Sequence, residues 1–306
     1  MKAPQPFQYQ GSKRILAPLI LRYLPGKMKR LIEPFAGSAA ISLACATEGR
    51  AGEYWLNDYN QPLAGLLSLI INRPEEISEH YARIWRDNDA DPLEHYYRVR
   101  EDFNCVRDPK LFLYLLARCV KGSVRYNADG LFNQSPDKRR LGTHPATMKQ
   151  NIMAVSSLLR GRSIITSQDY RDILASARPS DVVYMDPPYQ GVCGERDSRY
   201  YSGITSDDFV AALDQLNTRD IQYVVSYDGH LGARSYGEQL PAYLGLTLLE
   251  VEAGRSSQAT LLGRDEQTVE SLYISRNLAS ELNIKPARLS RTAPLDDGQL
   301  HFLAIK

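Results

Sequence analysis

The residues best suited to chemistry are an Asp-Pro-Pro-Tyr tetrapeptide at positions 186–189, which follows the apolar run 181–185. Two consecutive prolines fix the backbone φ angle at roughly −65° and remove two N–H donors, so the nearby carbonyl oxygens form a rigid set of acceptors. Asp186 adds a carboxylate and Tyr189 a flat aromatic face. Together they suit an exocyclic amine on a planar ring, such as a nucleobase. The alternative is a proline-terminated strand that leads into an ordinary surface turn.

The elements that must position this tetrapeptide follow an alternating pattern. Runs rich in β-branched residues alternate with helix-like segments, which is typical of an α/β protein with a parallel sheet and helices on both faces. Seven strands are expected, near 30–33, 54–56, 163–167, 181–185, 222–226, 244–251 and 268–275. The alternation stops between about 60 and 150, where helices and then a turn-rich basic stretch are expected. The sequence therefore predicts one doubly wound, mostly parallel α/β domain (1–59 and 150–277), a mainly helical insertion (60–149) and a C-terminal extension (278–306).

Acidic residues follow four of the expected strands, namely Glu33, Asp58, Asp169 and Asp186. Ligands of open α/β sheets bind at the carboxyl ends of the strands. An acidic rim would repel a pyrophosphate, and neither glycine-rich phosphate motif is present, so ATP and NAD are poor candidates. S-adenosylmethionine fits better because it carries a sulfonium, an ammonium and two ribose hydroxyls. Gly37 would let the backbone approach this ligand, and Asp58 could accept from the ribose, although Asp58 could instead cap a helix that begins near position 61.

Two residues near the N-terminus could complete this site. Tyr9 and Lys13 lie in a Tyr-Gln-Gly-Ser-Lys segment that precedes a helix-like stretch. Lys13 could meet the carboxylate of the cofactor, and Tyr9 could lie along its flat part. The alternative for Lys13 is a solvated residue at the start of a helix.

Bulk composition excludes several classes. The 306 residues are 43% hydrophobic and 24% charged, which is ordinary for a globular protein and argues against a disordered or fibrous chain. No apolar run is long enough to span a bilayer and no charged-then-apolar leader is visible, so a cytoplasmic protein is expected. The four cysteines lack close pairing, and the histidines do not fall at ligand spacing beside them, so neither disulfides nor a metal site is expected.

Charge is distributed unevenly along the chain. Residues 98–162 contain 13 Lys and Arg against 5 Asp and Glu, whereas the whole chain carries a net charge of only +1. Aromatic residues lie within this basic segment, among them Tyr114, Tyr126 and Phe132. Such a segment suits a polyanion with stackable bases. A solvated charged surface is the alternative.

Several motifs occur in a fixed order. The segments 9–13 (Tyr-Gln-Gly-Ser-Lys), 33–38 (Glu-Pro-Phe-Ala-Gly-Ser) and 57–58 (Asn-Asp) come first, and Asp-Pro-Pro-Tyr at 186–189 and Val-Glu-Ser-Leu-Tyr at 269–273 come last. Arg-Tyr-Asn at 125–127 and Gly-Leu-Phe-Asn at 130–133 lie between them. This order resembles the Dam-type (D12 class) N6-adenine-specific DNA methyltransferases over about residues 7–274. Three positions depart from the family pattern: Tyr9 is often Trp, and Ser12 and Ala39 are often Gly.

The resemblance implies methyl transfer from S-adenosylmethionine to the N6 amine of adenine in double-stranded DNA, after the base has been flipped out of the helix. It also implies a seven-stranded Rossmann-like methyltransferase sheet, with residues 60–149 as the target-recognition insertion. The implied catalytic residues are Asp186, Pro187, Pro188 and Tyr189. The implied cofactor-binding residues are Tyr9, Lys13, Glu33, Phe35, Gly37, Asp58, Asp169 and Asp186. The implied DNA-binding residues are Arg125, Tyr126, Asn127, Asn133, Lys138 and Arg139.

The expected partner is therefore double-stranded DNA, with no membrane partner and an association with the nucleoid through DNA. A monomer is expected in solution, with a transient dimer on DNA as the alternative. Two rival functions stay open. One is methylation of RNA or of the N4 amine of cytosine, which the motif order disfavours; the other is a non-catalytic DNA-binding protein that retains a degenerate methyltransferase fold.

Overall fold

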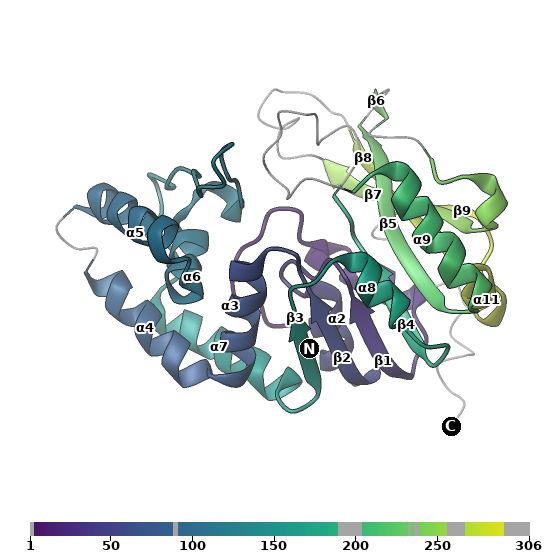
Figure 1. Ribbon diagram of the computed structural model, residues 1–306, viewed down its shortest axis with the longest axis horizontal. Coiled ribbons are helices and arrows are strands. Elements are labelled where there is room, and N and C mark those ends of the chain that lie inside the picture. The colour runs from purple at the N-terminus through teal and green to yellow at the C-terminus, as the bar shows by residue number, and fades with distance from the viewer. Residues whose placement is uncertain are drawn as a thin grey trace.

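The computed structural model describes residues 3–87, 91–188, 204–231, 234–235, 239–255 and 267–290. Within these ranges a nine-stranded sheet runs through the molecule in the order β3-β2-β1-β4-β5-β8-β7-β9, with β6 paired to β5 (Figure 1). All seven expected strands belong to it, which confirms a mixed α/β protein with a mostly parallel sheet. The strands are β1 (Met28–Glu33), β2 (Ala51–Asn57), β3 (Ser163–Thr166), β4 (Asp181–Met185), β5 (Gln222–Leu231), β6 (Arg234–Ser235), β7 (Thr247–Arg255), β8 (Gln267–Ile274) and β9 (Ala287–Ser290).

Strand pairing alone predicts a ligand position at the centre of the sheet. Strands β3, β2, β1, β4 and β5 pair in parallel, whereas β8 pairs antiparallel with both β5 and β7. The chain leaves β1 toward β2 on one side and later returns to β4 on the other side of β1. The strand order therefore reverses between β1 and β4, and a crevice forms at such a reversal, outside the carboxyl ends of the strands.

The two faces of the sheet carry separate apolar clusters, because successive strand residues point to opposite sides. Leu31 belongs to the first cluster and its neighbour Ile32 to the second; Val182 and Val183 divide in the same way. The first cluster includes residues of α1 (Ala17–Ile20), α2 (Ala40–Thr47) and α11 (Arg276–Glu281). The second includes residues of α8 (Tyr170–Ala175) and α9 (Ser206–Thr218). Helices thus cover both faces, as a doubly wound sheet requires.

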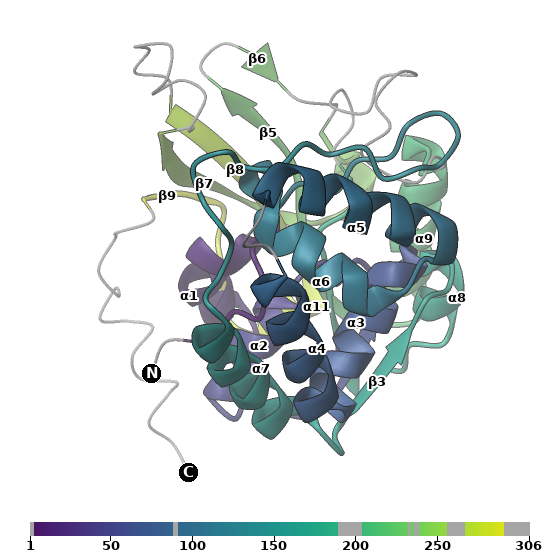
Figure 2. The ribbon, with the colours of Figure 1, turned by 90° about the vertical axis from the view of Figure 1, so that its left-hand side faces the viewer.

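Five helices lie between β2 and β3 in the sequence: α3 (Gln61–Asn72), α4 (Pro74–Arg86), α5 (Pro92–Val106), α6 (Pro109–Arg118) and α7 (Pro145–Leu159). Each has a proline in its first turn, where the missing N–H costs nothing. Side chains of Asn60, Asp91, Asp108 and His144 accept from the first backbone N–H groups of four of them. Seen from the side in Figure 2, these helices lie together in front of the sheet.

The helices of this segment share one apolar cluster with the sheet. Leu67, Phe112 and Met148 belong to the same buried cluster as Leu31 and Leu56 of the sheet. Helix α7 also crosses position 150, where the catalytic domain was expected to resume, and it contacts α2. The expected boundary near 150 therefore coincides with neither a break in secondary structure nor a break in the core.

A hairpin-like turn follows α6 and a short 3₁₀ turn, η3 (Val120–Gly122). Tyr126 and Phe132 form an antiparallel bridge, the Asn133 N–H donates to the Arg125 carbonyl, and the Asn127 N–H donates to the Leu131 carbonyl. Gly130 supplies the positive φ of 71° in the tip. The side-chain amide of Asn104 on α5 pairs with both backbone groups of Phe132, at 2.8 and 3.0 Å, and so fixes the hairpin to the helices.

The stretch beyond position 277, expected to be an irregular extension, adds a strand instead. After α11, strand β9 pairs in parallel with β7 and extends the sheet by one position. Residues 291–306 lie outside the described part of the chain. The remaining short elements are the 3₁₀ turns η1 (Lys13–Ile15), η2 (Leu21–Tyr23) and η4 (Ala242–Leu244).

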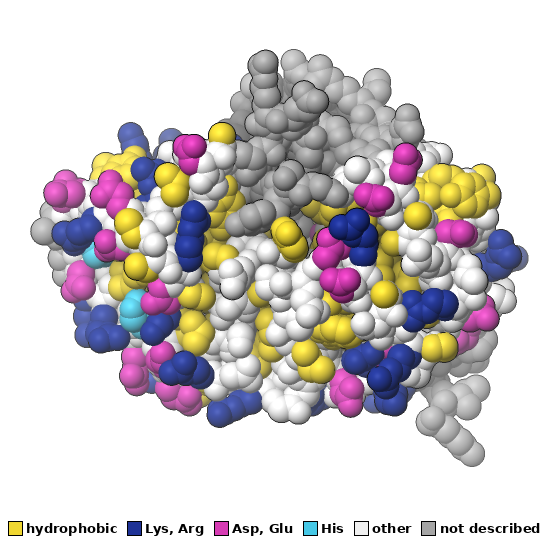
Figure 3. All heavy atoms as spheres, in the orientation of Figure 1, with side chains coloured by type: hydrophobic (Ala, Val, Ile, Leu, Met, Phe, Trp, Pro, Cys, Tyr) yellow, Lys and Arg dark blue, Asp and Glu magenta, His cyan; other side chains and the backbone are white. Residues whose placement is uncertain are grey.

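No helix in the described ranges is sufficiently long and apolar to cross a bilayer. On the face seen in Figure 3, Lys and Arg side chains alternate with Asp and Glu around α3, α4, α5 and α7 and do not gather into one large basic patch.

Candidate active site

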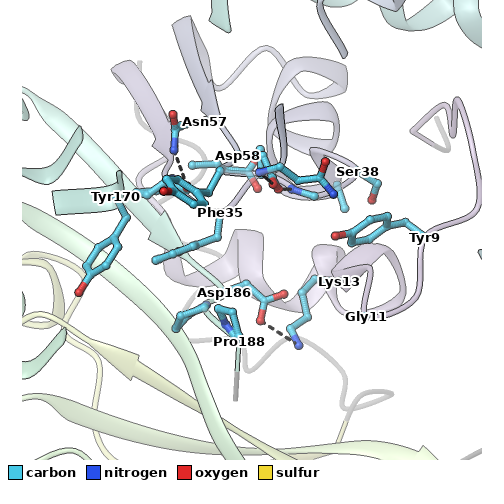
Figure 4. A pocket seen from close by; sticks show the side chains of 18 of the residues that line it. Tyr9, Gly11, Lys13, Phe35, Ser38, Asn57, Asp58, Tyr170, Asp186 and Pro188 are labelled. Carbon is cyan, nitrogen blue, oxygen red and sulfur yellow. Dashed lines mark hydrogen bonds and ion pairs between the residues drawn. The ribbon is translucent and has the colours of Figure 1, made fainter. Parts of the chain in front are cut away.

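A cavity of about 310 Å³ lies at the carboxyl ends of β1, β2 and β4, where the strand order reverses. Its volume falls at the lower end of the range of small-molecule sites. The N-terminal segment 9–13, the loop after β1 and the residues after β4 all contribute to its wall (Figure 4). The predicted site residues in this wall are Tyr9, Lys13, Glu33, Phe35, Gly37, Asp58, Tyr126, Asp169, Asp186, Pro187 and Pro188.

Asn57, at the end of β2, ties three strand ends together under the cavity. Its side-chain amide donates to the carbonyls of Pro34 and Gln168, both at 3.0 Å. Its Oδ1 accepts from the Gln168 N–H at 2.9 Å and from the Thr166 hydroxyl at 2.8 Å. Asn57 is buried, so these bonds form where water cannot replace them. They fix the loops after β1 and β3 relative to β2.

Asp58 does not cap the helix that follows it. Asn60 is the N-cap residue of α3, and its side chain accepts from the Leu63 N–H. Asp58 instead accepts from the Asn60 N–H through Oδ1 and from the Gly37 N–H through Oδ2, both at 2.9 Å. Burial raises the pKa of Asp58 to about 6, against the lowering effect of these two hydrogen bonds. Asp58 therefore joins β2 to the loop after β1 and presents a desolvated carboxyl to the cavity.

Glu33 ends β1 and is fully enclosed. Its Oε1 accepts from the backbone N–H of Ser42, in the first turn of α2, at 2.7 Å. The N-cap residue of that helix, Ala39, has no side-chain acceptor, so Glu33 supplies an acceptor that the helix end lacks. Burial raises the pKa of Glu33 to about 7, and the charge of Asp186 adds a smaller increase. Glu33 thus has a structural role in holding α2 as well as a place in the cavity wall.

The loop between β1 and α2 contains two residues with left-handed backbone. Gly37 has a φ of 51°, and a Cβ atom there would lie 3.0 Å from Cε1 of Tyr9, so the loop leaves space for the tyrosine ring. Ala39 has a φ of 54° and carries a side chain in a conformation that favours glycine. This explains physically why glycine suits position 39. Alanine is accommodated there at a cost of about 1 kcal/mol in backbone strain.

Ser12, the other departure from the family motif, has a direct partner. Its Oγ lies 2.9 Å from the Oγ of Ser38, and both residues line the cavity. The φ angle of Ser12 is −56°, which any residue adopts, so this position does not need glycine. The serine pair links the N-terminal segment to the loop after β1.

Lys13 lies between two carboxylates that come from distant parts of the chain. Its Nζ is 3.2 Å from Oδ1 of Asp186, which follows β4, and 3.1 Å from Oε2 of Glu270 on β8. Figure 4 shows the side chains of Lys13 and Asp186 pointing toward each other. Lys13 is only 7% exposed, so the alternative that it is a solvated residue at the start of a helix is wrong.

An aromatic wall lies across the cavity from Tyr9 (Figure 4). The rings of Phe35 and Tyr170 are 5.3 Å apart, and both line the cavity. Asp169, beside this wall, caps α8 and holds Arg171 through two side-chain hydrogen bonds of 2.8 and 2.9 Å. Arg171 lowers the pKa of Asp169, so Asp169 is an ionised, paired carboxylate at the rim.

The residues predicted to contact DNA have different surroundings. Arg125, Asn133, Lys138 and Arg139 are exposed, whereas the amide of Asn127 accepts from backbone N–H groups inside the hairpin turn. Tyr126 is 6% exposed, and its hydroxyl lies 3.1 Å from Nδ2 of Asn60. The ring of Tyr126 therefore points inward to the cavity wall and not to the surface of the hairpin.

Tyr189, predicted to stack on the target base, lies outside the described residues. Sequence reasoning assigned no site role to five of the residues described above: Ser12, Ser38, Asn60, Tyr170 and Glu270. Asn60 carried a usable signal, because it precedes a Gln-Pro helix start as an N-cap residue should. Glu270 carried none, since a single acidic residue within a strand says nothing about a lysine 257 positions away. In the described part of the chain, no group of three or more His, Cys, Asp or Glu residues could hold a metal ion.

Known proteins resemble this chain over most of its length. A DNA N-6-adenine-methyltransferase of Escherichia phage P1 is 29% identical over 202 residues, which are 64% of this chain and 25% of that protein. A DNA adenine methylase of Serratia marcescens is 30% identical over 60% of this chain and 65% of its own length. One from Vibrio cholerae serotype O1 is 27% identical over 87% of this chain and 94% of its own. The match thus spans a quarter of the phage protein and slightly less than two thirds of the Serratia protein.

The model of one protein family matches residues 9–255, from the N-terminal aromatic residue of the cavity to the end of β7. The matched range contains the cavity, the helical segment and the hairpin together. The chain belongs to the D12 class of N6 adenine-specific DNA methyltransferases.

Proposed function

We propose that this protein transfers a methyl group from S-adenosylmethionine to the N6 amine of adenine in double-stranded DNA. The observation that carries the proposal is that three groups of residues line one cavity. They are Asp186, Pro187 and Pro188 of the catalytic motif, the N-terminal motif at 9–13, and the acidic residues at the strand ends. Family membership supports the same reaction.

The cavity suits S-adenosylmethionine in shape and in chemistry. Two desolvated carboxyls, Glu33 and Asp58, have raised pKa values because burial disfavours their charge, and a cationic ligand or a pair of hydroxyl donors would relieve that cost. Asp58 would accept from the ribose hydroxyls, while Phe35 and Tyr9 supply flat faces on opposite sides. Gly37 leaves space for the Tyr9 ring beside the cofactor loop. Lys13, Asp169 and Asp186 complete the set assigned to the cofactor.

The bound cofactor would supply an electrophilic methyl group on a positively charged sulfur. Asp186 and the Pro187 carbonyl would accept the two N6 hydrogens of the extruded adenine and so direct the nitrogen lone pair toward that methyl group. Pro188 keeps this backbone rigid, and Tyr189 would stack on the base. Asp186 need not be a strong base, because the N6 proton becomes acidic only as the nitrogen gains positive charge. Positioning of the two reactants does most of the work.

The segment 60–149 is proposed to be the part that recognises DNA. Its hairpin exposes Arg125 and Asn133, and the following loop exposes Lys138 and Arg139. In Figure 1 the coil that follows α6 lies on the side of the molecule toward which the carboxyl ends of the parallel strands point. DNA held by this surface would therefore present its target base to the cavity.

A chain of hydrogen bonds connects the hairpin to the cofactor loop. Tyr126 bonds to Asn60, the Asn60 N–H donates to Asp58, and Asp58 accepts from Gly37. Asn60 and Tyr126 are buried, and the hydrogen bonds follow one another without a gap. A movement of the hairpin on DNA would therefore change the position of the Asp58 carboxylate, which is proposed to bind the ribose. Such coupling would make each ligand increase affinity for the other.

The reaction is tested by the Asp186→Ala variant on duplex DNA, with modified bases identified by sequencing. We expect DNA binding within a few-fold of the unmodified protein and no detectable N6-methyladenine. Asp214→Ala, which removes an exposed carboxylate from α9, should methylate normally. Methylation by Asp186→Ala at the normal rate would remove this residue from the mechanism, and modified cytosine in place of adenine would favour the N4 alternative.

Cofactor binding is tested separately from catalysis. A ligand that binds only the folded state raises its stability by about 2.7 kcal/mol at one hundred times its dissociation constant. Thermal unfolding should therefore shift upward with S-adenosylmethionine, and less so in Asp58→Ala. The absence of any shift at millimolar ligand would favour a degenerate, non-catalytic fold.

The role of Arg125 in DNA recognition is tested by Arg125→Ala across a panel of target sequences. A base-edge contact is worth roughly 1 to 3 kcal/mol at one position of the site, so the variant should relax the preference at that position only. A uniform loss over all sequences would instead identify a phosphate contact.

A further inference from the structure

We infer that Glu270 is a positioning residue that offsets the charge of Lys13 and thereby leaves the negative charge of Asp186 effective toward the reacting amine. The inference rests on the proposed methyl transfer and adds to it a residue from β8. Glu270 does not line the cavity in the described residues, so it would act through Lys13 and not by touching either reactant.

All three charged side chains are largely withdrawn from water. Lys13 is 7% exposed, and the side chains of Asp186 and Glu270 are 21% and 22% exposed. An ammonium removed from water to this extent needs a charged partner. Asp186 alone would satisfy that need, so the second carboxylate at 3.1 Å requires a separate explanation.

As the bond between N6 and the methyl group forms, the bond from that methyl group to sulfur breaks with its electron pair on sulfur. Positive charge therefore moves from the sulfur to the nitrogen, close to Asp186, until N6 releases one proton to water. A Lys13–Asp186 pair alone is neutral and would give little stabilisation to that charge. With Glu270 ionised as well, the three groups carry a net charge of −1, which favours the developing cation.

Lys13 holds Oδ1 of Asp186, so the position of the ammonium sets the orientation of the carboxylate. Glu270 lies on β8, in the register of Gly229 on β5 and Val251 on β7, with a neighbouring strand on each side. It is therefore a rigid anchor for the ammonium. Lys13 itself lies in the short 3₁₀ turn η1, so its ammonium depends on these two carboxylates for its charge partners.

The test uses Glu270→Gln in the full-length protein, with Glu250→Gln as the matched control. On β7, Val251 lies opposite Glu270, and its neighbour Glu250 lies opposite Ser271. Successive strand residues point to opposite faces, so the side chains of Glu250 and Glu270 lie on different faces of the sheet. We expect Glu270→Gln to lower kcat by about 10- to 100-fold, with the KM values for DNA and S-adenosylmethionine changed by less than about threefold. The control should keep both parameters. A normal kcat, or raised KM values with an unchanged kcat, would overturn the inference.

Lys13→Met and the double variant Lys13→Met/Glu270→Gln complete the experiment. The double variant leaves Asp186 without either neighbouring charge and restores the net charge of −1. With S-adenosylmethionine saturating, so that any weaker cofactor binding by Lys13→Met does not enter, its kcat should therefore exceed that of Glu270→Gln, whereas a merely structural role predicts a lower kcat. A double variant slower than both single variants would contradict the electrostatic role.

A second readout does not depend on methylation. The free energies of unfolding of the ligand-free single and double variants should be non-additive, because Lys13 and Glu270 are in contact. Additive effects would show that the ion pair does not exist in solution and would overturn the inference. If the unmodified protein failed to methylate DNA but the stabilities were coupled, the proposed function would fail while the Lys13–Glu270 contact stood.

Discussion

Replacement of Glu33 by glutamine gives the sharpest test of how the cavity is built. Glu33 is buried at the end of β1, and its pKa is raised to about 7 from an ordinary value of 4.5. The folded protein therefore binds a proton more tightly than the unfolded chain. This stabilisation is fully present below about pH 4.5 and is lost as the pH rises through 7.

The magnitude follows from the shift itself. A tenfold difference in proton affinity is worth about 1.4 kcal/mol, so ionisation of Glu33 in the folded state costs roughly 3 kcal/mol. Between pH 5 and pH 8 the protein should lose about 2 to 3 kcal/mol of stability through this residue alone. Glu33→Gln keeps an oxygen that can accept from the Ser42 N–H and removes the ionisable proton. The variant should therefore match the parent at pH 5 and exceed its stability at pH 8.

The assay is urea unfolding of both proteins, without ligands, at intervals from pH 5 to pH 8. The difference between the two curves isolates Glu33, because Asp58, whose pKa is also raised, contributes equally to both. Glu53→Gln, an exposed change on β2, controls for the loss of a surface charge. Parallel pH dependence in the parent and in Glu33→Gln would refute the reasoning, since it would mean that Glu33 ionises as easily in the fold as in water.

Two further substitutions probe the junctions around the cavity. Gly122→Ala should destabilise the protein by about 2 kcal/mol more than Gly130→Ala. Both glycines have positive φ, but of the two only Gly122 would bring its new Cβ against a backbone oxygen, that of Gln8. Urea unfolding of the two variants measures this difference, and equal losses would mean that the Gln8 backbone moves away freely. Tyr126→Phe removes the hydroxyl that meets Asn60 and should reduce the mutual strengthening of cofactor and DNA binding, with a loss of about 1 kcal/mol in the coupling free energy. Titration of each ligand with and without the other measures that coupling, and an unchanged value would show that the hydrogen-bond chain does not carry it.

The sequence alone was sufficient for the fold class and for the four carboxylates of the cavity wall. Apolar runs in the sequence predict the strands. Because the carboxyl ends of parallel strands meet at one edge of the sheet, the sequence also predicts that Glu33, Asp58 and Asp186 lie close together. The order of the motifs identified the family for the same reason, since each motif is a short local pattern. Local patterns could not show how β9 continues the sheet, because four residues with little apolar character carry no clear strand signal.

The tertiary structure decided what each polar group does at its position. Asp58 could have been either a ligand or a helix cap by sequence, and the structure assigns the cap to Asn60 while Asp58 bonds to the Gly37 N–H. Tyr126 was predicted to contact DNA together with its neighbour Arg125. Arg125 is exposed, whereas the ring of Tyr126 is buried and lines the cavity. Lys13 pairs with Asp186, just after β4, and with Glu270 on β8, because burial and charge pairing depend on contacts between residues that are far apart in the chain.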